Sequence, residues 1–461
     1  MLNENHYQCL KNIVTTENIY IDKAHLLAYC YDATKSRFEP DAVVFPREEQ
    51  EVSQILKYCN DNQITVVPRG YGSGFTGGAL PSCGGIILCL DKHMNKILEI
   101  DLENLLGIVQ PGVINKDFQN EVEKLGLFYP PDPASEAFST LGGNVAENAG
   151  GMRASKYGIT KDYVIALRAV LPNGDIIKSG KKTIKDVAGL NTTGILIGSE
   201  GILAVITQIT LKLIAKPKCK KTYMGIFPDV TCAMNAVFKS LSSGANPVAM
   251  EFLDDLVIGA VREKFKINLP HDAGAVLIGD VDGNTQDELE IQLKILENSF
   301  AENGSNNFKI AQSEDEVNDL WFARRNASAS TNMYGTKKLN EDISVPRSKL
   351  PLALEGIYEI GEKYGFKIPC FGHAGDGNIH VNLMVKDKNN QNEMDDGHKA
   401  IEEIFKLVVD LEGTLSGEHG IGLAKAPFMH IAFEDHEMEL FRSIKKAFDP
   451  NNILNPHKMG L

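Results

Sequence analysis

Apolar and polar positions near the start of the chain alternate in a pattern typical of strand, helix and strand. Residues 42–46 (AVVFP) and 64–67 (ITVV) are apolar or β-branched runs, which favour buried strands. Between them, apolar side chains recur with the spacing of one helix face. These side chains are Val52, Ile55, Leu56 and Cys59. The pattern therefore predicts a strand, a helix and a second strand over residues 42–67.

Short strands continue through the first half of the chain. The apolar runs predict strands at residues 85–90, 97–100, 105–112, 164–177 and 203–214, and a helix over residues 115–125. Asn173 and Gly174 interrupt the fourth of these runs, and this dipeptide is a strong hairpin signal. We therefore expect two antiparallel strands that meet at this turn.

The pattern changes after the stretch AKPKCKK at residues 215–221. Strands are then predicted at residues 222–227, 247–252 and 275–280 and near residues 368 and 380, and helices at 229–242, 285–301, 348–364 and 395–411. One face of the second helix carries Leu289, Leu293 and Leu296. A chain of 461 residues is also too long for one core, so we expect a domain boundary near residue 217.

Composition and charge exclude several classes of protein. The formal net charge of −14 disfavours a general nucleic-acid binder, because phosphate neutralisation needs clustered Lys and Arg. No run approaches about 20 apolar residues, so no transmembrane segment is expected. The N-terminal stretch lacks the features of a signal peptide, which predicts a cytoplasmic protein and leaves peripheral attachment at the inner face of the membrane open. Eight cysteines without a C-x-x-C pair predict reduced thiols and no iron–sulfur cluster in this chain.

A glycine-rich loop at residues 66–80 contains the pattern G-x-G-x-x-G at Gly72, Gly74 and Gly77. In a Rossmann domain such a turn opens directly into a helix, whereas here the chain continues into the strand predicted at 85–90. A Walker loop is also excluded, because no Gly-Lys-Ser/Thr closes the turn. Two interpretations remain: backbone N–H groups that wrap a diphosphate, or a plain glycine-rich hairpin.

A second loop of this kind lies at residues 129–158, and it has little apolar content after Val145. A third glycine-containing stretch, LIGSEGILAVIT, follows at residues 196–207. Three such stretches are hard to explain as core or as ordinary linker. Together they favour one elongated ligand that lies along a glycine-lined channel.

The three stretches together resemble the FAD-binding domain of the vanillyl-alcohol oxidase (PCMH) type, in the branch of the FAD-linked D-lactate dehydrogenases and glycolate oxidases. The similarity extends along nearly the whole chain, to AFDPNNILNPHKMG near the C-terminus. It implies an α+β protein in which residues 1–217 form the FAD-binding domain. A second α+β, ferredoxin-like substrate cap domain with a metal site is implied for residues 218–415, and a C-terminal segment, 416–461, would complete the flavin site and the active site.

The resemblance implies FAD and not NAD as the cofactor. The first loop corresponds to the family's pyrophosphate loop, the second to the isoalloxazine side and the third to the adenine and ribose side. Since residues 66–80 contain no His or Cys for a covalent link, we expect non-covalent FAD. The residues implied to bind it are Pro68, Arg69, Gly70, Gly72, Ser73, Gly74, Thr76, Gly77, Gly78, Pro131, Asp132, Ser135, Thr140, Gly142, Gly143, Asn148, Gly150, Gly151, Tyr157, Gly158, Glu200, Gly201, Ile206 and Asn455.

Two later motifs carry candidate metal ligands. His373 and His380 lie on either side of a Gly-Asp-Gly-Asn turn, and Glu418 and His419 follow in SGEHG. A single histidine is more often a structural residue, but two His and one Glu form a ligand set suited to Zn²⁺, Mn²⁺ or Fe²⁺. The turn is expected to direct both imidazoles toward one point.

The resemblance assigns roles within these motifs. It implies that His373, His380 and Glu418 bind the divalent metal and that His419 is the general base. Asp376 and Asn378 are expected to be turn or supporting residues.

A cationic side chain completes the expected site. Arg324, three residues after Trp321, matches the position that holds the substrate carboxylate in family members, although Arg324 and Arg325 also fit a plain surface helix. Relatives that act on dicarboxylic acids place a Lys just before the strand that corresponds to EDISVP, where this chain has Asn340.

The implied activity is oxidation of a small D-2-hydroxyacid, D-lactate or glycolate, to the 2-oxoacid. His419 would take the hydroxyl proton while a hydride passes to flavin N5. The implied electron acceptor is a quinone, an electron-transfer flavoprotein or an iron–sulfur subunit. Two alternatives stay open at this point: a non-catalytic FAD-carrying electron-transfer subunit of a glycolate oxidase-like complex, and a flavin-free metal hydrolase.

Overall fold

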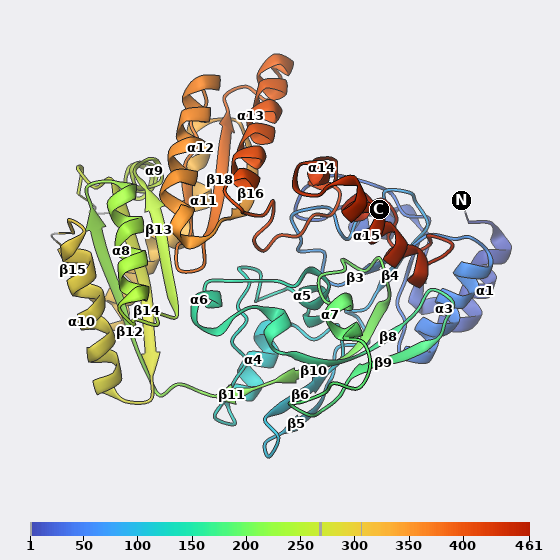
Figure 1. Cartoon of the computed structure of the whole chain (residues 1–461). Helices are drawn as coiled ribbons and strands as arrows, with labels where there is room; N and C mark the ends of the chain where they lie inside the picture. Colours follow the sequence, from blue (N-terminus) through green and yellow to red (C-terminus); the bar gives the residue numbers. More distant parts are fainter. Residues whose placement is uncertain (1, 267–269, 306) are drawn as a thin grey trace. The chain divides into compact units, whose positions relative to one another are not determined.

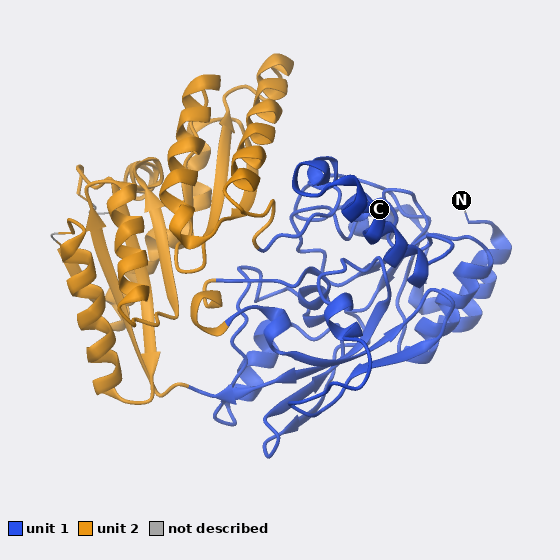
Figure 2. Cartoon of the chain, viewed as in Figure 1, with its two compact units in different colours: residues 1–151, 158–216, 418–461 blue, residues 152–157, 217–417 orange. Residues whose placement is uncertain are grey.

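The computed structural model describes residues 2–266, 270–305 and 307–461, and the chain folds into two compact units. Figure 2 shows unit 1, which comprises residues 1–151, 158–216 and 418–461, and unit 2, which comprises residues 152–157 and 217–417. The chain therefore contributes a short segment to unit 2 at residues 152–157, leaves unit 1 again after residue 216 and returns to it at residue 418.

A four-stranded sheet forms the first part of unit 1, in the order β1-β2-β4-β3. Figure 1 labels two of its strands, β3 and β4. Its strands are β1 (Ile19–Tyr20), β2 (Ala42–Val44), β4 (Ile86–Cys89) and β3 (Val66–Arg69). Helix α3 (Glu49–Asp61) connects β2 to β3, and its four predicted apolar side chains are buried. The predicted strand, helix and strand are thus confirmed, although the second strand begins at Val66, two residues later than expected.

The core beside this sheet also takes in both ends of the chain. Helix α1 (Glu4–Val14) buries Leu10 and Val14 against the sheet. Near the other end, Ile453 and Leu454 belong to the same core, and Leu454 forms a parallel bridge with Val66. The C-terminal segment is therefore an integral part of unit 1.

A five-stranded antiparallel sheet forms the second part of unit 1, in the order β5-β6-β10-β8-β9. Its strands are β5 (Ile97–Asp101), β6 (Leu106–Val109), β10 (Val205–Lys212), β8 (Val164–Val170) and β9 (Ile176–Gly180). The predicted hairpin is confirmed, because β8 and β9 pair across a turn in which Gly174 has φ +90°. A small pair, β7 (Leu127–Phe128) and β11 (Ile214–Ala215), lies outside this sheet.

The helices of unit 1 include several that the sequence pattern did not predict. Helix α5 (Leu141–Glu147) lies inside the second glycine-rich loop, where Thr140 Oγ1 accepts a hydrogen bond from the amide of Gly143 and caps the helix. The capping signal outweighs the low helix propensity of its glycines. The remaining helices are α2 (Lys23–Tyr29), α4 (Asn115–Glu123), α7 (Thr192–Leu196), α14 (Met429–Ala432) and α15 (Asp435–Phe448).

Unit 2 is built on one antiparallel seven-stranded sheet, in the order β15-β12-β14-β13-β17-β18-β16. Its strands are β12 (Cys219–Phe227), β13 (Ala249–Asp254), β14 (Ala275–Gly283), β15 (Asn307–Ile310), β16 (Lys337–Ser344), β17 (Cys370–His373) and β18 (Asn378–Val385). Its helices are α6 (Ala154–Tyr157), α8 (Val230–Ser242), α9 (Asp255–Phe265), α10 (Gln286–Glu302), α11 (Glu314–Ser330), α12 (Leu350–Tyr364) and α13 (Gln391–Asp410).

Helices pack against this sheet (Figure 1). The stripe predicted on α10 is buried as expected, and α10 packs against β12 and β14. Helices α9 and α11 share a core with β12, β13 and β14, in which Leu320 and Trp321 of α11 take part. Within the described part of the chain, every helix is too short or too polar to cross a bilayer.

Candidate functional site

A cavity in unit 1 is lined by all three glycine-containing stretches. Its wall is formed by residues within 68–79, 133–150 and 199–206, together with Leu90, Pro111, Glu418 and His419. Every one of these residues belongs to unit 1. The structure therefore brings together the three stretches that the sequence assigned to one elongated ligand.

Most of the predicted cofactor residues lie on this wall. They are Pro68, Arg69, Gly70, Gly72, Ser73, Gly74, Gly78, Ser135, Thr140, Gly142, Gly143, Gly150, Glu200, Gly201 and Ile206. Close approach requires glycine at two of these positions. A Cβ atom at Gly70 would lie 2.2 Å from Thr140 Oγ1, and one at Gly78 would lie 2.8 Å from Glu147 Oε1. The backbone of the first loop thus lies close against side chains of the second loop at these two positions. A glycine-rich backbone of this kind can present its N–H groups to a diphosphate, which fits FAD.

The other predicted cofactor residues do not line the cavity. They are Thr76, Gly77, Pro131, Asp132, Asn148, Gly151, Tyr157, Gly158 and Asn455. Asn455 has a clear structural role, because its Nδ2 donates to the carbonyl oxygens of Gly78 (2.8 Å) and Glu200 (2.7 Å) and ties two of the lining stretches together. Tyr157 belongs to unit 2, where its hydroxyl donates to Asp282 Oδ2 at 2.8 Å.

Two acidic residues, Glu147 and Glu200, line the cavity. Glu200 accepts hydrogen bonds from the amides of Ile421 (2.6 Å) and Gly422 (2.7 Å), which fixes the segment directly after His419. Glu147 Oε2 is buried without a hydrogen-bond partner among the described residues. Burial, and then the negative charges of Glu200 and Asp32, raise the pKa of the Glu147 carboxyl well above its usual range. This environment therefore favours the neutral, protonated form of the Glu147 carboxyl.

Replacement of Glu147 by Gln is expected to stabilise the FAD-free protein at alkaline pH. A carboxyl whose pKa is raised by folding weakens the fold once the pH exceeds the unfolded pKa, because the unfolded chain then releases the proton more readily. The Tm of Glu147→Gln should exceed that of the wild type by at least about 2 °C at pH 8. The difference should shrink as the pH falls toward about 4.5, the ordinary carboxyl pKa.

Thermal unfolding of the FAD-free protein at both pH values measures this difference. Glu103→Gln is the matched control, because Glu103 is an exposed carboxylate of the same unit. Equal Tm values for wild type and Glu147→Gln at pH 8 would show that Glu147 has a partner in solution.

The two motif histidines of unit 2 meet, as the sequence predicted. His373 ends β17 and His380 lies in β18, and their ring centroids are 5.2 Å apart with an interplanar angle of 82°. The turn between them closes when the amide of Gly377, which has φ +95°, donates to the carbonyl of His373 at 3.1 Å. Asn378, after this turn, donates through Nδ2 to Asp342 Oδ1 (2.5 Å).

Glu251 is a buried acid that sequence analysis missed. Its side chain is 0% exposed, and its two oxygens lie 2.7 and 2.8 Å from His373 Nδ1. Arg324 Nε donates to Glu251 Oε2 at 2.6 Å. Burial alone raises the pKa of Glu251, but its contacts with His373 and Arg324 outweigh burial and lower it. A charged residue inside the apolar strand AMEFLD was the available signal.

Arg324 is thus not a plain surface charge. It lies on α11, its Nε is committed to Glu251, and its guanidinium lies 4.9 Å from the ring centre of Phe371. Any carboxylate that it binds must use the two Nη groups. Arg325 is different, because its Nη2 donates to the carbonyl of Asn318 at an exposed position.

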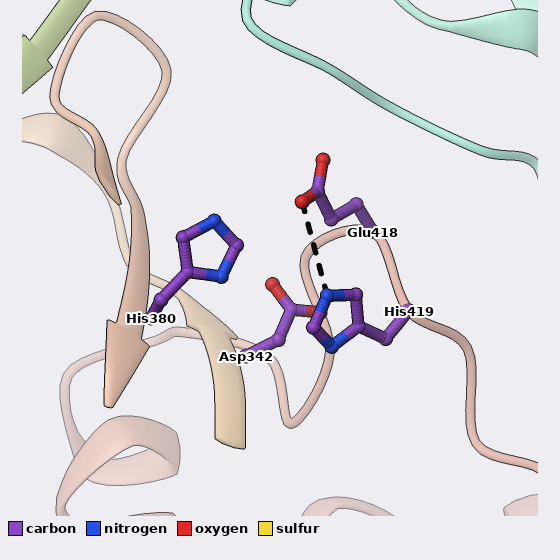
Figure 3. A group of neighbouring side chains, drawn as sticks. All are labelled: Asp342, His380, Glu418 and His419. Carbon is purple, nitrogen blue, oxygen red and sulfur yellow. Dashed lines mark ion pairs between the residues drawn. The ribbon is translucent and has the colours of Figure 1, made fainter. Parts of the chain in front are cut away.

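Asp342 is the second acid that sequence analysis missed. It lies in β16 as the direct cross-strand partner of His380, and Figure 3 shows the two side chains on these neighbouring strands. Asp342 is 0% exposed, and its Oδ2 accepts hydrogen bonds from Ser416 Oγ and from the amide of Gly417, both at 3.0 Å. It therefore anchors the last residues of unit 2, and Glu418 is the next residue in the chain.

Glu418 and His419 begin the C-terminal segment of unit 1 and line its cavity. His419 Nε2 lies 3.9 Å from Glu418 Oε1, the ion pair drawn in Figure 3. The ring of His419 packs 5.2 Å from that of Phe75, and its carbonyl accepts a hydrogen bond from Thr76 Oγ1 at 3.3 Å. The first glycine-rich loop thus holds His419 at the cavity.

Comparisons with known proteins identify the family and the fold of the chain. Residues 40–180 match the family model described as FAD binding domain, and residues 216–459 match that of the FAD linked oxidases, C-terminal domain. Among solved structures, p-cresol methylhydroxylase with substrate bound is similar in fold, with a TM-score of 0.81 and 18% identity over 100% of this chain and 98% of that chain. The predicted fold class is thereby confirmed.

Relatives of known name cover almost the full chain. It is 42% identical to glycolate oxidase subunit GlcD of Bacillus subtilis (strain 168), over 96% of this chain and 94% of the relative. It is 35% identical to D-lactate dehydrogenase of Anaerostipes hadrus, over 93% of this chain and 91% of the relative. The identity to D-2-hydroxyglutarate dehydrogenase of Stutzerimonas stutzeri (strain A1501) is 30%, over 98% of this chain and 97% of the relative. The chain therefore belongs to the FAD-linked oxidases, in the branch that contains D-lactate dehydrogenase and the GlcD component of glycolate oxidase.

Proposed function

We propose that this protein is an FAD-dependent dehydrogenase that oxidises a small D-2-hydroxyacid to the corresponding 2-oxoacid. The single observation that carries the proposal is the position of Glu418 and His419. Both side chains line the glycine-rich cavity, and both follow directly after Gly417, which Asp342 holds beside the strand of His380. This oxidation needs a metal ligand and a general base beside the flavin. The names of the relatives support the substrate class.

Non-covalent FAD would lie in the cavity of unit 1, held by the wall residues of the three glycine-containing stretches. When bound, FAD supplies an acceptor for a hydride. The N–H groups of residues 70–78 would bind the diphosphate. Asn455 and Glu200 would keep the surrounding segments in place through the hydrogen bonds described above.

A divalent metal would be bound by His373, His380 and Glu418, with Zn²⁺, Mn²⁺ and Fe²⁺ as the chemically matched ions. Asp342, the cross-strand partner of His380 in unit 2, offers a further carboxylate beside that histidine. Because Glu251 occupies His373 Nδ1, the ligand atom of His373 would be Nε2. A carboxylate on the other ring nitrogen is the usual way in which a metal-binding histidine is oriented. The metal would lower the pKa of the substrate hydroxyl.

His419 would take the hydroxyl proton of the substrate at Nε2, the nitrogen that lies 3.9 Å from Glu418 Oε1. Arg324 would bind the substrate carboxylate through its Nη groups, while Glu251 fixes its position. Asn340, exposed within β16 and not before it, offers no cation for a second carboxylate, which favours a monocarboxylic substrate such as D-lactate or glycolate. The electrons would pass on to a quinone, an electron-transfer flavoprotein or an iron–sulfur subunit.

The proposal is tested by turnover of the purified, yellow protein with an artificial electron acceptor. We expect D-lactate or glycolate to be oxidised and L-lactate to be a much poorer substrate. Acid precipitation should release intact FAD, because residues 66–80 contain no His or Cys. Bound FAD without turnover of any 2-hydroxyacid would instead support a non-catalytic electron-transfer subunit.

A further inference from the structure

The segment between β9 and α7 displays apolar side chains fully to solvent. All residues from 181 to 190 are exposed. Three large apolar side chains stand out within it: Ile184 is 101% exposed, Val187 99% and Leu190 87%. The next most exposed large apolar side chain in the described part of the chain is Ile291, at 64%. Packing against the described part of the chain therefore does not explain these three side chains.

This loop, residues 181–190, has local structure of its own. Thr183 Oγ1 donates to the carbonyl of Lys185, and the amide of Ala188 donates to Asp186 Oδ1, both at 3.0 Å. Lys182 pairs with Glu99 of β5 at 2.9 Å, which attaches one side of the loop to unit 1. A Cβ atom at Gly189 would meet nothing within 4 Å. The loop therefore has internal hydrogen bonds of its own and projects into solvent.

Its charge is opposite to that of the whole chain. Residues 178–186 contain four lysines and a single acid, Asp186, in a protein with a formal net charge of −14. These lysines are Lys178, Lys181, Lys182 and Lys185. Apolar side chains interleaved with lysines are typical of segments that lie in the headgroup region of a bilayer, where the lysines meet lipid phosphates.

The size of the loop argues against a protein as its occupant. A stable protein–protein interface buries about 800 Å² on each partner and uses roughly 20–30 residues. A projecting loop of ten residues offers less than this, whereas a bilayer requires only a few inserted side chains and neighbouring cations.

We propose that the loop of residues 181–190 docks this protein on an anionic lipid bilayer. Ile184, Val187 and Leu190 enter the headgroup region, and Lys181 and Lys185 contact lipid phosphates. Because the rest of the chain carries excess negative charge, attachment to an anionic surface depends on this loop. The inference is independent of the proposed hydroxyacid chemistry, because it involves no residue of the cavity or of the metal-ligand set.

Co-sedimentation of the FAD-loaded protein with lipid vesicles tests this proposal. We expect binding to vesicles of phosphatidylcholine with phosphatidylglycerol, weaker binding to phosphatidylcholine alone, and loss of binding as salt is raised. Ile184→Ser/Val187→Ser/Leu190→Ser should weaken binding at least about ten-fold. Lys181→Gln and Lys185→Gln should each weaken it by about five-fold.

A matched triple variant distinguishes binding through this loop from nonspecific adsorption through other exposed apolar side chains. Phe238→Ser/Ile291→Ser/Leu440→Ser removes three other exposed apolar side chains and should bind as the wild type does. Val187→Trp reports insertion directly, because Trp321, the one natural tryptophan, is only 7% exposed. Its fluorescence should shift to the blue with anionic vesicles only.

Three outcomes would overturn the proposal. One is a wild-type protein that stays in the supernatant at low salt with anionic vesicles. Another is equal loss of binding in the two triple variants. The third is a wild-type oligomer that the loop variant converts to a monomer without any vesicle binding, since the loop would then be a protein interface.

Discussion

The His380→Ala variant is expected to lose its divalent metal and most of its turnover while it keeps FAD. His380 lies in β18 of unit 2, whereas the cavity assigned to FAD is lined by residues of unit 1 alone. Loss of an outer partner of a metal ligand typically weakens metal affinity by about 10- to 100-fold, so loss of a ligand itself should exceed that range. Metal content by elemental analysis and flavin content by visible absorption measure the two effects separately.

Two further variants serve as comparisons for His380→Ala. His398→Ala removes an exposed histidine of α13 in the same unit and should change neither metal nor FAD content. Glu251→Gln leaves the ligands in place but removes the carboxylate beside His373 Nδ1, so it should weaken metal affinity by about 10- to 100-fold. Wild-type metal content and rate in His380→Ala would show that the ligand assignment is wrong. Loss of FAD in that variant would show that the site is misplaced.

The His419→Gln variant is expected to separate chemistry from binding. His419 lines the cavity next to the proposed ligand Glu418, and its ring is held against Phe75. A positioned base contributes about 10²- to 10⁴-fold to proton transfer. The variant should therefore retain metal, FAD and substrate affinity, while substrate reduces its flavin more slowly by a factor in that range.

Anaerobic flavin reduction is the appropriate measurement for this variant, because the electron acceptor then cannot limit the rate. Glu418→Gln is its partner and should lose metal as well as rate. Metal loss in His419→Gln together with metal retention in Glu418→Gln would show that His419 is the metal ligand and that Glu418 is not. A rate within a few-fold of the wild type would remove His419 as the base.

Much of the fold followed from local patterns along the chain. The helix between β2 and β3, the leucine stripe on α10 and the Asn173–Gly174 hairpin each depend on residues close in sequence, and the structure confirms them. Helix α5 was not predicted, because its glycines and asparagines suggest a loop and only the Thr140 cap indicates a helix. The second strand, predicted at residues 64–67, is shifted by two residues, because its pairing with β4 runs from Val66 to Arg69.

The candidate site was predictable where its motifs are contiguous. His373 and His380 are joined by one tight turn, so their proximity could be inferred from seven residues of sequence. Glu251 and Asp342 come from strands far away in sequence and reach these histidines only through the register of the seven-stranded sheet. No periodicity encodes such a pairing. A charged residue at a buried strand position was the single local sign of each.

The most direct measurement of the central claim is anaerobic mixing of the purified protein with D-lactate and with glycolate while the blue absorption of the flavin is followed. The same protein is measured as isolated, after treatment with a chelator, and after a divalent metal is restored. We predict that one of the two acids bleaches the flavin, that chelation abolishes bleaching without release of FAD, and that the metal restores it. Flavin that stays oxidised with both acids in the metal-loaded protein, or that bleaches equally fast without metal, would contradict the account.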